Sequence, residues 1–263
     1  MILYIHTNRR PRISIDFVNH KPGLWTRRRR NLFAHSPESR QRWGGGLGSG
    51  REEDMPFYKD RVYPHLVSAL GNPKPIETIR QRLVPLAQGK VLEIGVGPGV
   101  NFAHYDSAKV TKVYALEPNP GMIRMAEQER QRTKLDIEFL DLPGERIPLA
   151  DDSVDTVVST FTLCTIPDVV EAIRGIGRVL KPGGQFIFFE HGLSPDPQVR
   201  RWQELTEPLF RWAFEGCHVT RDIPSLIGNG GFKIEQMDAG YLAPFPKSGS
   251  HCWWGVARPE LQK

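Results

Sequence analysis

The sequence is poor in cysteine and holds no long hydrophobic run. Its 263 residues include three widely spaced cysteines, Cys164, Cys217 and Cys252. Such a set forms no disulfide framework, and no Cys-x-x-Cys pair or local Cys and His cluster is present, so we expect no bound metal. No stretch approaches the ~18 consecutive apolar residues of a membrane-spanning helix, and the N-terminus lacks the apolar core of a secretory signal. We therefore expect a cytoplasmic protein in a reducing setting, with no transmembrane segment.

The positive charge is concentrated near the N-terminus. The chain has 35 Lys and Arg against 30 Asp and Glu, of which residues 1–54 hold 11 and 5, so the remainder carries a net charge of −1. Residues 1–54 contain four consecutive arginines (27–30) and no regular periodicity, which predicts a disordered basic tail. Several interpretations stay open: a nucleic-acid arm, a membrane tether, a transit peptide, a solvated tail, or a segment upstream of a true start at Met55.

Residues 55–263 predict a single α/β domain with an N-terminal helical lid from about residue 57. Helical periodicity is expected at residues 63–70, 76–86, 119–132, 169–180, 199–214 and after 222. Short apolar runs predict strands at residues 91–94, 112–116, 137–140, 154–160, 185–190, 232–237 and 251–257. Because helices separate most of the strands, we predict a Rossmann-like, doubly wound, mostly parallel seven-stranded sheet with helices on both faces.

A glycine-rich loop, Gly95-Val96-Gly97-Pro98-Gly99, follows the first predicted strand. Glycines let the backbone turn sharply and approach a ligand closely. Val100 occupies the position of the third small residue in a dinucleotide fingerprint, and the Lys-Ser/Thr of a P-loop is missing, so neither NAD nor ATP is favoured. Glu117 ends the second strand, where its carboxylate either accepts hydrogen bonds from ribose hydroxyls or stabilises the next helix.

Four segments, at residues 91–99, 115–119, 144–155 and 179–184, resemble in order and spacing the motifs of class I S-adenosylmethionine-dependent methyltransferases. The resemblance implies a methyltransferase with S-adenosyl-L-methionine as cofactor. It places the glycine loop at the methionine part of the cofactor, Glu117 at the ribose, and the turn after the third strand at the adenine. That turn has Pro143 where the family commonly has an acid, so adenine contacts would come from backbone groups or Asp141. The cofactor residues we expect are Glu93, Gly95, Gly97, Gly99, Asn101, Glu117, Pro118, Asn119, Gly144, Glu145 and Thr160.

The methyl acceptor is less constrained by the sequence. A thiol is partly ionised at neutral pH, whereas a carbon or alcohol acceptor usually needs a positioned base. His191, after the fifth strand, is either such a base or part of the pocket wall, and Cys164 is expected to be an apolar filler. Residues 99–102, 161–164 and 214–222 are similar to the alkyl-thiol S-methyltransferases and their bacterial relatives, which implies a small apolar thiol acceptor.

His191, from its strand-end position, and His218, from the similar segment, are the candidate catalytic residues. His218 and Cys217 are expected to line the acceptor pocket, while Thr220 and Asp222 are expected to cap a helix. Two other functions stay open. One is C- or O-methylation of a quinone-like, lipid or phenolic acceptor. The other is nucleic-acid binding through the Arg-rich tail, although the −1 charge of the remainder argues against modification of nucleic-acid bases. We expect a small-molecule acceptor as the partner, and the sequence leaves the oligomeric state open.

Overall fold

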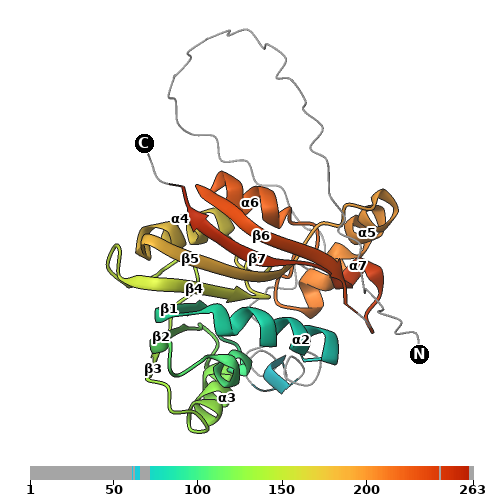
Figure 1. Ribbon diagram of the computed structural model, residues 1–263. Coiled ribbons are helices and arrows are strands. Elements are labelled where there is room, and N and C mark those ends of the chain that lie inside the picture. Colours follow the sequence, from blue (N-terminus) through green and yellow to red (C-terminus); the bar gives the residue numbers. More distant parts are fainter. Residues whose placement is uncertain (1–60, 62, 66–71, 243, 261–263) are drawn as a thin grey trace, which may run out of the picture. The chain divides into compact units, whose positions relative to one another are not determined.

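The computed structural model describes residues 61, 63–65, 72–242 and 244–260 (Figure 1). The basic tail predicted for residues 1–54 lies outside this part of the chain, as does most of the helix predicted at 63–70. Both therefore stay predictions. Among the helices of the described residues, none combines the length and the apolar character that a membrane span requires.

Seven strands form one sheet in the order β3-β2-β1-β4-β5-β7-β6. Strands β1 to β5 run parallel to one another, and β7 lies antiparallel between β5 and β6. The predicted Rossmann-like class is confirmed. The strands are β1 (Gly89–Ile94), β2 (Val110–Leu116), β3 (Ile137–Leu140), β4 (Val154–Thr160), β5 (Leu180–His191), β6 (Phe232–Tyr241) and β7 (His251–Pro259).

Helices cover both faces of the sheet, because its central strands are apolar on both sides. In β5, Phe186 and Phe188 belong to the core cluster that includes residues of α4 and α6, whereas Ile187 between them belongs to a second cluster with residues of η2, η3 and α3. The helical elements are α2 (Lys74–Leu83), η2 (Val84–Leu86), η3 (Val100–His104), α3 (Pro120–Arg130), α4 (Val169–Val179), α5 (Pro197–Ala213), α6 (Ile223–Asn229) and α7 (Lys247–Ser250).

Most predicted elements differ from the structure by a few residues at one end or both, and two of these differences have a clear cause. The helix expected at 76–86 ends at Leu83 and continues as the 3₁₀ turn η2, which changes the periodicity and leaves Leu86 45% exposed rather than on the buried stripe. The last parallel strand starts at Leu180, not at residue 185. Val154 pairs with Leu180 but Thr156 with Gln185, so residues 181–184 are accommodated as an irregularity within the strand.

The strand order reverses at β1, which has β2 and β3 on one side and β4 on the other. Ligands of doubly wound sheets bind outside the carboxyl ends of the strands at such a switch point. The segments that follow β1, β2 and β4 therefore meet at one edge of the sheet. The candidate site lies there.

Candidate functional site

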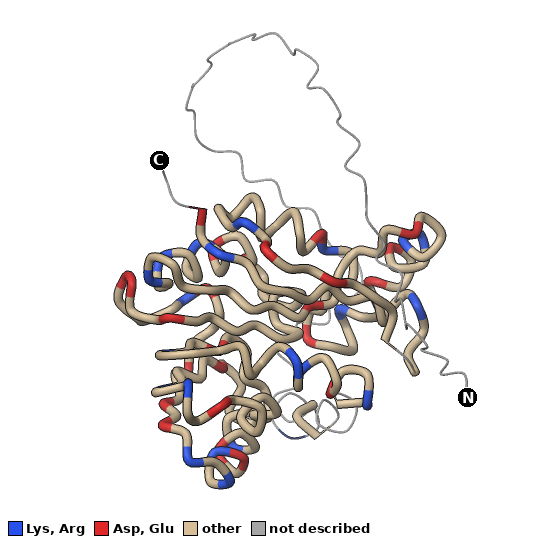
Figure 2. Tube along the Cα trace, in the orientation of Figure 1, with Lys and Arg blue, Asp and Glu red and all other residues tan. Residues whose placement is uncertain are grey.

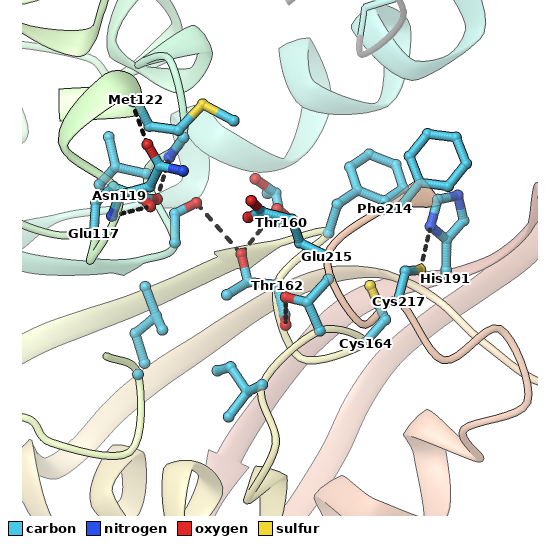
Figure 3. A pocket seen from close by; sticks show the side chains of 18 of the residues that line it. Glu117, Asn119, Met122, Thr160, Thr162, Cys164, His191, Phe214, Glu215 and Cys217 are labelled. Carbon is cyan, nitrogen blue, oxygen red and sulfur yellow. Dashed lines mark hydrogen bonds between the residues drawn. The ribbon is translucent and has the colours of Figure 1, made fainter. Parts of the chain in front are cut away.

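A cavity of about 610 Å³ lies at the carboxyl ends of β1, β2, β4 and β5. Its volume is in the range of sites that hold small molecules or cofactors. Figure 3 shows Glu117 and Asn119 toward one end, and Cys164, His191 and Cys217 toward the other. The two ends thus differ in chemistry, the first polar and the second formed by sulfur and rings.

The glycine loop after β1 forms part of the cavity wall. Gly95 has φ +67°, and a Cβ there would lie 2.1 Å from Thr162 Oγ1, so this position needs glycine for packing. Gly97 has φ +56°, and a Cβ there would meet no atom within 4 Å. The left-handed backbone and the open space beside Gly97 leave room for a ligand to approach the chain closely.

Glu117 fixes the position of this loop. Its Oε2 accepts a hydrogen bond from Gly97 N at 2.9 Å, and its Oε1 accepts one from Asn119 N at 3.0 Å. Burial raises the pKa of Glu117 to about 7, although both backbone hydrogen bonds act to lower it. Each carboxylate oxygen retains a further lone pair, so the group is able to accept hydroxyl hydrogen bonds as well.

A buried ionic network that the sequence analysis missed supports the same region. Arg80, 6% exposed, donates from Nη1 to Asn101 Oδ1 at 2.5 Å and to Thr160 Oγ1 at 3.2 Å. Glu93 accepts hydrogen bonds from Asn101 Nδ2 at 2.8 Å and from the Tyr105 hydroxyl at 2.7 Å. Burial raises the pKa of Glu93 to about 7, and Arg80 opposes this rise. The one available signal was the spacing of Arg80, four residues after buried Ile76 on the apolar stripe of α2.

The other end of the cavity brings together Cys164 after β4, His191 at the end of β5 and Cys217 after α5. His191 Nδ1 lies 3.8 Å from Cys217 Sγ, and the His191 ring lies 4.7 Å from the Phe161 ring. Phe161 has φ +56°. Positive φ is uncommon outside glycine and concentrates at functional sites. The strained backbone at Phe161 therefore indicates that this turn serves the cavity.

His218 occupies a different place from the one expected. Its Nδ1 lies 2.8 Å from Glu207 Oε1 of α5, and it is absent from the residues that line the cavity. Thr220 also donates to Glu207 and does not cap α6. Asp222 does cap this helix, since its side chain accepts from Ser225 N. Because both side chains contact the Glu207 carboxylate, His218 does not line the cavity and Thr220 does not cap α6.

The expected cofactor residues divide into two groups by position. Those that line the cavity are Gly95, Gly97, Glu117, Pro118, Asn119, Gly144, Glu145 and Thr160. Glu93, Gly99 and Asn101 lie outside its lining. Glu93 and Asn101 belong to the buried network. Gly99, with φ +83°, precedes η3, where a Cβ would lie 3.0 Å from Ala126 Cα.

Comparison with known proteins agrees with this geometry. The model of the family described as "Methyltransferase domain" matches residues 92–188. Human Thiol S-methyltransferase TMT1A is 33% identical over 67% of this chain and 70% of its own length. Rat Thiol S-methyltransferase TMT1B is 34% identical over 56% of this chain, which spans 62% of that relative.

More distant matches include a ubiquinone/menaquinone biosynthesis C-methyltransferase UbiE of Bartonella tribocorum, 29% identical over 56% of this chain and 54% of its own length. Among solved structures, the YcgJ protein of Bacillus subtilis is similar with a TM-score of 0.57, covering 71% of this chain and all of that chain at 16% identity. This last likeness shows a shared fold.

Proposed function

The chain belongs to the class I S-adenosylmethionine-dependent methyltransferases, and we propose that it methylates the sulfur of a small, apolar alkyl thiol. The observation that carries the choice of acceptor is the far end of the cavity, where Cys164, Cys217 and aromatic side chains surround His191. Such a surface suits a small apolar ligand with a polarisable sulfur atom. The thiol S-methyltransferases TMT1A and TMT1B, at 33–35% identity, support the same acceptor.

The residues at the other end fit the cofactor. S-adenosylmethionine supplies a methyl group activated on a sulfonium sulfur. Gly97 leaves open space beside the loop, Glu117 offers buried carboxylate oxygens for ribose hydroxyls, and Gly144 with Glu145 borders the same cavity. The two ends of one cavity would then align donor and acceptor for an in-line displacement, which requires mainly orientation and exclusion of water.

A thiol needs less help from the protein than a phenol or a carbon acid. The pKa of a free thiol, about 8.5, leaves a few per cent as nucleophilic thiolate at neutral pH. His191 contacts Cys217 Sγ on one side and the Phe161 ring on the other. These contacts suit a residue of the pocket wall or a metal ligand better than an exposed general base. This environment favours sulfur as the attacking atom.

The affinity for S-adenosylhomocysteine should increase with pH through about 7. The ionised form of Glu117 is the better acceptor for ribose hydroxyls, and its pKa in the free protein is about 7. The fraction ionised rises with pH, so Kd should fall about tenfold between pH 6 and pH 8. Isothermal titration calorimetry checks this. Glu117→Gln should bind more weakly with a flat profile, and an unchanged pH dependence in that variant would assign the titration to another group.

The acceptor itself is tested by a product analysis. Purified protein is incubated with S-adenosylmethionine and an alkyl thiol, a phenol or a demethylated quinol, and the products are identified by mass spectrometry. We expect the thioether to form with a kcat/KM at least tenfold above those of the other acceptors. Methylation of the quinol or the phenol with the thiol left unmodified would contradict the thiol assignment while leaving the family membership intact.

A quinone-like acceptor is the second candidate, because UbiE-type C-methyltransferases match this chain at 27–29% identity. The same product analysis decides between the two. The nucleic-acid alternative depends on residues 1–54, outside the described part. Along the described elements, basic and acidic residues are intermixed (Figure 2). On α3, for example, Arg130 forms an ion pair with Glu127. This mixed surface favours the small-molecule interpretation.

A further inference from the structure

We propose that Cys164, His191 and Cys217 bind a zinc ion in the acceptor end of the cavity, and that the fourth position of this ion receives the sulfur of the acceptor. The first half of the proposal is a metal site and stands alone. The second half rests on the proposed function.

The geometry of the three residues carries the metal site. One ligand atom from each of them, two sulfurs and one imidazole nitrogen, lies within 4.8 Å of the others, with Cys217 Sγ and His191 Nδ1 at 3.8 Å. In a tetrahedral zinc site with bonds of about 2.0–2.3 Å, neighbouring ligand atoms are separated by roughly 3.3–3.8 Å. Small side-chain adjustments are therefore enough to place all three around one ion.

The backbone holds the two cysteine segments together. His218 N donates a hydrogen bond to Cys164 O at 2.8 Å, which ties the turn carrying Cys217 to the turn carrying Cys164. Cys164 N in turn faces Glu190 Oε2 at 3.4 Å, and Glu190 is fully buried in β5, next to His191. Hydrogen bonds between the segments after β4 and α5, and between the turn after β4 and β5, thus hold the three residues near one another without a metal ion.

The donor set selects the kind of ion. Two thiolates and one imidazole are the ligands of zinc and other thiophilic ions, whereas magnesium and calcium require oxygen. Three protein ligands with one open position are the pattern of catalytic zinc sites, while structural sites are closed by four. Because all three residues line the cavity, the open position faces the space where the acceptor would lie.

The chemistry of a zinc-bound thiol fits the reaction. The acceptor thiol loses its proton to solvent as its sulfur binds the ion, which keeps the sulfur as a thiolate at neutral pH. That sulfur then forms a bond to the methyl carbon. The bond between this carbon and the sulfonium sulfur breaks, and its electron pair remains on the departing sulfur, giving S-adenosylhomocysteine. The neutral thioether product is a weaker ligand than a thiolate and dissociates.

No local sequence pattern indicates this site, and the sequence alone predicts no bound metal. His191 follows Cys164 by 27 residues and precedes Cys217 by 26, so no short metal-binding spacing connects the three. Parallel strands bring their carboxyl ends to one edge of the sheet, and only that arrangement places the three side chains together.

The metal site is tested on the full chain, purified under reducing conditions with zinc supplied. Zinc content is measured by mass spectrometry and zinc affinity by competition with a chromophoric chelator. We expect one zinc per chain and a loss of affinity of roughly 100-fold or more in Cys164→Ser, Cys217→Ser and His191→Ala, since each removes one ligand. Cys252→Ser is the matched control: Cys252 is also buried and pairs with His191 across β5 and β7, but it is not one of the three.

Folding of the variants is checked by S-adenosylhomocysteine binding, which uses the opposite end of the cavity and should stay within about threefold of wild type. Zinc-free wild-type protein, or zinc affinity unchanged in the three variants, would overturn the site. Loss of zinc in Cys252→Ser would show a site closed by four ligands and overturn the open position.

The fourth ligand is tested by replacing zinc with cobalt(II). An added alkyl thiol should increase the sulfur-to-cobalt charge-transfer absorption, and a thioether should not. A cobalt spectrum that does not change when the thiol is added would overturn the proposal that the acceptor sulfur binds the metal. Failure of the metal site and failure of the proposed function are distinguishable. Thiol methylation that continues after zinc is removed by a chelator would support the proposed function and contradict a role for the metal. Bound zinc without thiol methylation would support the metal site and contradict the proposed function.

Discussion

Replacing Gly97 with leucine is expected to weaken binding of S-adenosylhomocysteine by about 100-fold or more while the protein stays folded. A Cβ at Gly97 meets no atom within 4 Å, so the added side chain has space in the free protein. That space belongs to the cavity wall where the cofactor would lie. The positive φ of +56° adds about 1–2 kcal/mol of strain for a residue other than glycine.

Gly183→Leu is the matched control for this prediction. Gly183 has φ +78°, and its Cβ would also meet nothing within 4 Å, but it lies outside the cavity lining. Both variants should lose a similar amount of stability in chemical denaturation, and only Gly97→Leu should lose the ligand in calorimetry. Equal affinities in the two variants would mean that the cofactor does not approach the loop at Gly97.

Replacing Arg80 with methionine should lower the free energy of unfolding by about 1–3 kcal/mol, the range found when a buried polar group such as Asn101 Oδ1 loses its hydrogen-bond partner. Arg80 is 6% exposed and hydrogen-bonds Asn101, which in turn donates to Glu93. Without the guanidinium, Glu93 is a buried carboxylate with no opposing charge from α2. Denaturant unfolding at pH 8 measures the effect.

The pH dependence of this loss identifies its cause. Glu93 already has a pKa near 7 because of burial, and loss of Arg80 should raise it further. A raised carboxyl pKa means that the folded state binds more protons than the unfolded state, so the variant should lose stability as pH rises. We expect a smaller deficit at pH 5 than at pH 8. Arg82→Met, at an exposed position of the same helix, should change stability by no more than about 0.5 kcal/mol. An equal deficit at both pH values would indicate lost packing instead.

The strands and the position of the glycine loop and Glu117 at the cavity were predictable because their signals are local. The runs at residues 137–140 and 154–160 match the bounds of β3 and β4, although β3 is an edge strand with Glu138 exposed and only β4 is buried along most of its length. Gly95, Gly97 and Glu117 follow directly from a loop and a strand end in consecutive βα units. These positions need only neighbours in the sequence to be recognised.

The acceptor end was not predictable in the same way. From the sequence, Cys164 is predicted to be an apolar filler and Cys217 a pocket residue. Their proximity to His191 depends on the strand order. The role of His218 differed because Glu207, eleven residues earlier on α5, pairs with it. Arg80 was missed because a charged residue on an amphipathic helix ordinarily faces solvent. Each miss involves a partner distant in sequence that pattern alone does not identify.

Isothermal titration of the purified full chain with S-adenosylhomocysteine is the most direct test that this cavity is a methyltransferase site. The account predicts saturable binding of one ligand per chain, tighter at pH 8 than at pH 6, and its loss in Gly97→Leu but not in Gly183→Leu. Folded protein that shows no saturable binding at either pH would contradict it.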